Sequence, residues 1–141
     1  INPEMAFFIP LIGAMAGNVG IQSSAIIVQG IASNSLGLER TSRKLFKELL
    51  VGLLNGLILA SILFLYNYFF SDSLALTFTV STSLFVVIIF AAMFGTMIPL
   101  LLHKLKFDPA LATGPCITTM NDIMGLFIYF MMGKLLYGIV T

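Results

Sequence analysis

The chain has 141 residues, of which 59% are hydrophobic and only 9% carry a charge. Its mean hydropathy is +1.06, whereas soluble domains carry charges on roughly 25% of their residues, so the composition indicates an integral membrane protein. The formal net charge is only +1 and the sequence has no extended basic patch, so no nucleic-acid partner is expected. The length fits a single domain, 1–141, embedded in a lipid bilayer.

Four stretches are apolar enough and long enough to cross a bilayer as helices, which takes about 20 residues each. They cover about 5–36, 49–70, 74–102 and 110–140. These lengths predict an all-α protein with four transmembrane helices, some of which tilt, bend or emerge into water at their ends. The chain starts without a methionine or a basic leader, so it is expected to be a piece of a longer protein rather than to begin with a signal peptide.

The segment between the first two spans, 38–50, is amphipathic. Leu45 and Leu49 alternate with Arg43 and Lys47 along it. This pattern fits a short interfacial helix that runs into the second span, and it equally fits a solvated basic loop.

The basic residues are concentrated in two of the three connections between the spans. Four lie between the first and second spans, two between the third and fourth, and none in the connection 71–73. The positive-inside rule therefore places both basic connections in the cytoplasm and both ends of the chain outside. A cytosolic amino-terminal region would then require one more span upstream. The basic residues of the two connections are Arg40, Arg43, Lys44, Lys47, Lys104 and Lys106.

Carboxamide side chains recur along one face of the first span. Asn18, Gln22 and Gln29 follow the i, i+4, i+11 spacing that stacks residues on one side of a helix. An unsatisfied amide is costly in hydrocarbon, so these side chains are expected either to line a water-filled path or to form hydrogen bonds between helices, the second alternative applying most to Gln29. Glycines 13, 17 and 20 on the same span allow another backbone to approach closely.

The fourth span carries a carboxylate, Asp122, well inside an apolar segment. Such residues are costly in hydrocarbon and usually mark an ion or substrate path. Thr118, Asp122 and Gly125 lie on one helical stripe, and Asn121 flanks it. Asp108 comes earlier, directly before a proline at the membrane edge, where helix capping is the expected role.

A lone carboxylate among amides, hydroxyls and carbonyls is a set of hard oxygen ligands, and Mg²⁺ fits it because this ion keeps several waters and takes one or two carboxylates. One aspartate per chain is a weak site, so the sequence favours a homodimer in which two copies of Asp122 share an ion. An aspartyl protease would need a second carboxylate within a span, and His103 lies in a connection, so no enzymatic activity is expected. A proton-coupled transporter and a non-transporting scaffold remain as alternatives.

Two separated motifs resemble those of the MgtE-type magnesium transporters. The segment Pro10–Gln22, P-L-I-G-A-M-A-G-N-V-G-I-Q, resembles the family signature P-x(6)-G-N-x-G-x-Q, and Asp108–Ala112 followed by Thr118–Tyr129 is similar to the last transmembrane helix of the family. The resemblance implies a five-helix domain of which this chain holds the last four helices, in a bacterial cell membrane. It also implies that the first helix and the cytosolic Mg²⁺-sensing domains lie outside this chain.

The resemblance further implies a homodimer with a pore along the subunit interface, lined by the first and fourth spans of this chain. The carboxylate that matches Asp122 is then expected to bind hydrated Mg²⁺, together with oxygens around Gly114, Thr118 and Gly125. Asn18, Gln22, Gln29 and Asn121 are the expected pore-lining residues. Related carriers act as exchangers, so a proton- or sodium-coupled divalent cation exchanger is the alternative function.

Overall fold

The structure is a computed structural model that describes residues 3–33, 38–112 and 114–140. Its long helices are α1 (Ile9–Ala32), α2 (Leu38–Phe70), α3 (Leu74–Lys104) and α4 (Pro115–Val140). Short 3-10 helices precede two of them, η1 (Pro3–Phe8) before α1 and η2 (Pro109–Ala112) before α4. The described residues contain no strand, and each long helix includes a stretch long and apolar enough to cross a membrane. The expected all-α membrane fold is therefore confirmed.

Proline and capping residues account for where several of these helices begin. Pro10, Pro109 and Pro115 stand in the first two positions of α1, η2 and α4, where a proline fits because the first N–H groups of a helix have no intrahelical partner. The Ser73 hydroxyl caps α3 by accepting the Leu76 N–H at 3.2 Å. Asp108 accepts the Ala110 N–H at 3.0 Å, so its expected capping role is confirmed.

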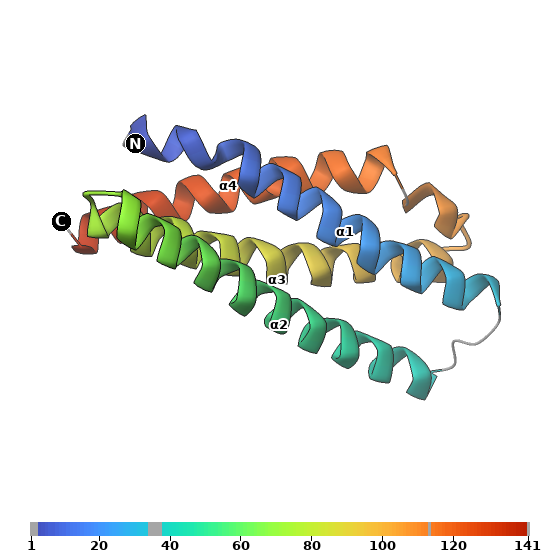
Figure 1. Cartoon of the computed structure of the whole chain (residues 1–141). Helices are drawn as coiled ribbons and strands as arrows, with labels where there is room; N and C mark the ends of the chain where they lie inside the picture. Colours follow the sequence, from blue (N-terminus) through green and yellow to red (C-terminus); the bar gives the residue numbers. More distant parts are fainter. Residues whose placement is uncertain (1–2, 34–37, 113, 141) are drawn as a thin grey trace.

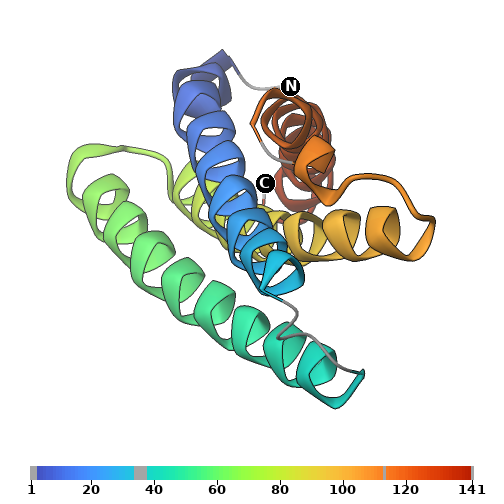
Figure 2. The same cartoon turned by 90° about the vertical axis from the view of Figure 1, so that its right-hand side faces the viewer.

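Helix α3 lies at the centre of the bundle and packs against the other three long helices (Figures 1 and 2). α1 and α4 also pack against each other, whereas α1 and α2 make little direct contact. In Figure 2, α1 lies between α4 on one side and α2 on the other. The fold therefore has two separate helix–helix interfaces of interest here, which we call seams. One lies between α1 and α4, and the other lies between α2 and α3.

The ends of the helices divide into two groups along the bundle (Figure 1). The two chain termini and the connection 71–73 lie at one end, and the start of α2 and the segment before η2 lie at the other. Both basic connections of the sequence therefore belong to the same end of the molecule. This arrangement has the geometry that the charge distribution predicts.

Helix α2 begins earlier than the second expected span, which starts at 49. Residues 38–50 are helical, so the structure agrees with the helix rather than with the loop alternative, but they form the first turns of α2 and not a separate helix. At 33 residues the helix is about 50 Å long, whereas the hydrocarbon core is about 30 Å thick. The last residues of the first expected span, 34–36, lie outside the described residues.

Glycines set the closest approaches to α3. The position of a Cβ on Gly95 would be 2.9 Å from the Cα of Gly20 and would also contact the Gly20 carbonyl oxygen, so the backbones of α1 and α3 touch there. A Cβ on Gly52 of α2 would lie 3.0 Å from that of Ala92. α1 and α2 are therefore each held against α3 by a contact that a larger residue would block.

Candidate cation site between α1 and α4

The carboxylate of Asp122 lies in the seam between α4 and α1, at a place that two glycines leave open. Its Oδ1 atom is 3.2 Å from the position of a Cβ on Gly17 and 3.9 Å from that of a Cβ on Gly13. The Cγ2 atom of Thr118, one turn earlier on α4, is 3.1 Å from the same Gly17 position. Side chains on α1 would fill this space, so the glycine pattern of the first span makes room for the polar stripe of the fourth.

Asp122 is only partly exposed, and no other described residue forms a hydrogen bond or an ion pair with its carboxylate. Lys134 on the same helix is exposed and lies 12 positions further on, which is about 18 Å of helix. A carboxylate within an apolar helix, open to one side and without a cationic partner, is expected to have water or a cation as its neighbour.

The carboxamides of α1 form a separate exposed row. Asn18, Gln22 and Gln29 are all exposed, and Asn18 directly follows Gly17 in the chain. Their side chains therefore do not form the interhelical hydrogen bonds of the alternative interpretation with any described helix of this chain. Polar side chains on the outer surface of a membrane helix need water or another protein surface.

The other three expected ligand residues have different environments. Gly114 has a φ of 70° and nothing within 4 Å of a Cβ position, but its carbonyl oxygen already accepts the Thr118 N–H at 3.1 Å and the Thr118 hydroxyl at 3.0 Å. Gly125 is buried, with the Ala16 Cβ 3.1 Å and a Val87 methyl 3.3 Å from its Cβ position. The structure thus brings Thr118 close to Asp122, places Gly114 one turn away, and makes Gly125 a spacer between helices.

Asn121, expected along the pore, is fully buried. Its amide nitrogen contacts the position of a Cβ on Gly20, and its Cγ is 2.9 Å from that position. Neither the amide nitrogen nor the amide oxygen has a hydrogen-bond partner among the described residues. The side chain therefore lies inside the α1–α4 seam, on the side of α4 that faces the bundle.

Sequence reasoning overlooked a buried carboxylate, Glu48 in α2. It is only 7% exposed and accepts a hydrogen bond of 3.0 Å from the hydroxyl of Ser23, which is 2% exposed. Glu48, Gly52 and Gly56 are all buried and recur every four residues, so they form one face of the helix. This E-x(3)-G-x(3)-G spacing is the signal in the sequence that would have found the residue.

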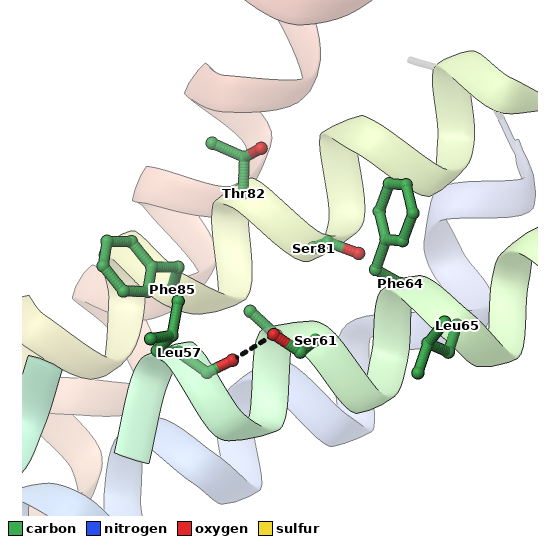
Figure 3. A pocket seen from close by; sticks show the side chains of 8 residues that line it. Leu57, Ser61, Phe64, Leu65, Ser81, Thr82 and Phe85 are labelled. Carbon is green, nitrogen blue, oxygen red and sulfur yellow. Dashed lines mark hydrogen bonds between the residues drawn. The ribbon is translucent and has the colours of Figure 1, made fainter. Parts of the chain in front are cut away.

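A cavity of about 510 Å³ lies away from Asp122, between α2 and α3 (Figure 3). Its lining is mostly apolar, with Leu57 and Phe64 from α2 and Phe85 from α3, and no charged residue contributes to it. The Ser61 hydroxyl donates to the Leu57 carbonyl of its own helix at 2.6 Å (Figure 3). This cavity offers the hydroxyls of Ser61, Ser81 and Thr82 but no carboxylate to balance the charge of a cation, so the α1–α4 seam is the better candidate site.

Comparison with known proteins identifies the family of the chain. Residues 9–132 match the family model named MgtE, which is described as a divalent cation transporter. The chain belongs to the MgtE family. It is therefore a multi-pass membrane protein of a transporter family, and the all-α fold with four membrane-spanning helices fits that assignment.

Three curated MgtE relatives are similar over most of the chain. It is 39% identical over 126 residues to the magnesium transporter MgtE of Bacillus subtilis and 38% identical over 132 residues to that of Thermus thermophilus. It is 36% identical over 126 residues to that of Enterococcus faecalis. These alignments cover 89–94% of this chain but only 28–29% of the relatives, so the chain corresponds to less than a third of their length.

Proposed function

We propose that this chain is the pore domain of a magnesium transporter and moves hydrated Mg²⁺ across the membrane past Asp122. The observation that carries the proposal is the partly exposed Asp122 carboxylate, which has no partner among the described residues and lies against Gly13 and Gly17. The printed names of the three relatives support Mg²⁺ as the substrate. The whole of 1–141 forms one domain in this proposal.

The chemistry of the seam suits a cation that keeps most of its water. Groups of three or more histidine, cysteine, aspartate and glutamate side chains that would enclose a bare metal ion are absent from the described residues. Mg²⁺ dehydrates reluctantly and is held through one or two carboxylates and its own waters. In the proposal Asp122 binds the waters of the ion, the Thr118 hydroxyl accepts from one of them, and oxygens near Gly114 complete the outer shell. Gly125 is a spacer that lets α4 pack against α1 and α3.

A second copy of the chain is part of the proposal. One carboxylate per chain would leave a divalent ion half neutralised, whereas two copies related by a two-fold axis supply two. The exposed carboxamides Asn18, Gln22 and Gln29 support the same arrangement, because a water-filled pore between two copies would hydrate them. Asn121 then lies directly behind the pore wall.

The orientation follows from the charge distribution. The end of the bundle that holds the start of α2 and the segment before η2 carries the basic residues of the two connections and is proposed to face the cytoplasm. The two termini of the chain are then extracytoplasmic, in a bacterial cell membrane.

The direct test is Mg²⁺ uptake into liposomes that contain the full-length protein. Asp122→Ala is expected to abolish uptake, while size-exclusion chromatography in detergent shows an unchanged dimer. Asp72→Asn, which alters an exposed carboxylate in the connection 71–73, is the matched control and is expected to transport normally. Uptake by Asp122→Ala at the wild-type rate would refute the proposal, and uptake that stops without an opposing proton or sodium gradient would favour the exchanger instead.

A further inference from the structure

The buried pair Ser23–Glu48 lies outside the α1–α4 seam and has no part in the site described above. Ser23 is on α1 and Glu48 is on α2, 25 positions apart in the sequence, and the hydroxyl donates to the carboxylate at 3.0 Å. Both side chains are more than nine-tenths buried. Burying a carboxylate is costly unless it is hydrogen-bonded, so this contact is expected to be specific rather than incidental.

The described lysines nearest to Glu48 on α2 do not explain its burial. Lys44 and Lys47, the nearest cations along α2, are half-buried and exposed respectively, and no ion pair between either of them and Glu48 occurs among the described residues. The carboxylate instead continues the face of α2 that packs inward through Gly52 and Gly56. It thus points into the protein and away from the basic surface.

The pair joins two helices that otherwise make little direct contact. α1 is held against α3 by the contact of Gly20 with Gly95. At the other end of α1, the preceding η1 is held to α4 by the Tyr129 hydroxyl, which donates to the Met5 carbonyl at 2.7 Å. Ser23 is one turn beyond Gly20 and next to the exposed Gln22. The hydrogen bond to Glu48 therefore fixes the rotation of α1 in the segment that presents Gln22.

We propose that Glu48 is a positioning residue for cation passage, which holds the C-terminal half of α1 through Ser23 so that Asn18 and Gln22 face the pore. This inference rests on the proposed function of the α1–α4 seam. Glu48 acts here as a hydrogen-bond acceptor and is not itself a ligand of the ion. A glutamine at this position retains an acceptor oxygen, whereas a leucine does not.

The test compares conservative and disruptive variants of both residues by Mg²⁺ uptake into liposomes over a range of Mg²⁺ concentrations. Glu48→Leu and Ser23→Ala are each expected to lower the maximal rate by roughly tenfold, the effect of losing one hydrogen bond to a charged group, with the half-saturating concentration unchanged. Glu48→Gln and Ser23→Thr are expected to retain most of the wild-type maximal rate. The double variant Ser23→Ala/Glu48→Leu is expected to be no slower than either single variant, because both remove the same contact.

Two results would overturn the proposal. If Glu48→Gln loses transport and raises the half-saturating concentration while Ser23→Ala transports normally, Glu48 is an ion ligand. If the effects of Ser23→Ala and Glu48→Leu on thermal unfolding simply add, the two residues are not coupled. The two proposals can fail separately, because thermal unfolding is measured without transport. If Mg²⁺ uptake does not depend on Asp122, the proposed function is refuted, and the unfolding of the Ser23 and Glu48 variants still tests their contact.

Discussion

The Oδ1 atom of Asp122 in α4 lies 3.2 Å from the position that a Cβ on Gly17 of α1 would occupy. The carboxylate thus fits against α1 only because residue 17 has no side chain. The distances for the three glycines of this seam differ, since a Cβ on Gly13 would be 3.9 Å from Asp122 whereas one on Gly20 would overlap Asn121. These differences predict a graded response to alanine.

Gly17→Ala is expected to impair transport because its methyl group would press on both Asp122 and Thr118. Overpacking of this kind costs about 1–3 kcal/mol, so we expect uptake of Mg²⁺ to fall by roughly tenfold. Gly13→Ala makes only an ordinary van der Waals contact and should stay within about twofold of wild type. Gly138→Ala, with nothing within 4 Å of its Cβ position, is the control for the change in helix propensity. Equal uptake by all three variants would show that the seam does not hold the carboxylate in place.

Gly20→Ala is expected to be the most destabilising of the series, because its methyl group collides with the buried amide of Asn121. The collision disappears if the amide is removed, so Gly20→Ala in an Asn121→Ala background should recover most of the thermal stability that the single Gly20→Ala variant loses. A double variant as unstable as the sum of the two single variants would place the strain elsewhere, for example against Ile117, whose Cγ2 atom is 3.2 Å from the same Cβ position.

Tyr129→Phe is expected to lower the free energy of unfolding by about 1–3 kcal/mol, because it leaves the buried carbonyl of Met5 without its donor. Tyr68→Phe removes a hydroxyl from a ring that is 56% exposed, and it should change the stability by less than about 0.5 kcal/mol. Thermal unfolding in detergent measures both. Equal stability of the two variants would show that the η1–α4 contact contributes little.

Bound Mg²⁺ is expected to stabilise the protein against heat in a way that depends on Asp122. A ligand present at 100 times its dissociation constant adds about 2.7 kcal/mol to the free energy of unfolding. The melting temperature of the wild type should therefore rise as MgCl₂ is added and fall again when EDTA removes the ion. Asp122→Asn should show no such rise, and a rise of the same size in that variant would place the stabilising ion at a different site.

The four helices were predictable because hydrophobic length is a strong signal, and so was the shared end of the two basic connections. The start of α2 was less so, since the charged residues 38–48 fit a loop as well as a helix. Glu48 was hidden by the same charges. Beside Lys44 and Lys47 it reads as part of a solvated surface, unless its spacing with Gly52 and Gly56 is noticed, and the contact with Ser23 shows that it turns inward.

Some of the site residues were likewise predictable from the sequence, and others were not. Asp122 and Thr118 were expected together because they are one turn apart on a single helix, and the structure brings both of them against Gly17. Asn121 and Gly125 were assigned to the site with them, but which side of a helix a neighbouring helix covers depends on packing rather than on spacing. Asn121 is covered by α1, and Gly125 by α1 and α3.

The contact between Gly20 and Gly95 has a mechanical consequence for α1. Because the backbones of α1 and α3 touch there, α1 cannot slide past α3 without separating from it. α1 can still tilt about this contact, which then acts as a pivot. Ser23 is about 4.5 Å from this pivot along the helix, whereas the start of α1 at Ile9 is about 16.5 Å away on the other side. A displacement imposed through Glu48 would therefore be magnified nearly fourfold, and reversed in direction, where α1 meets the opposite face of the membrane.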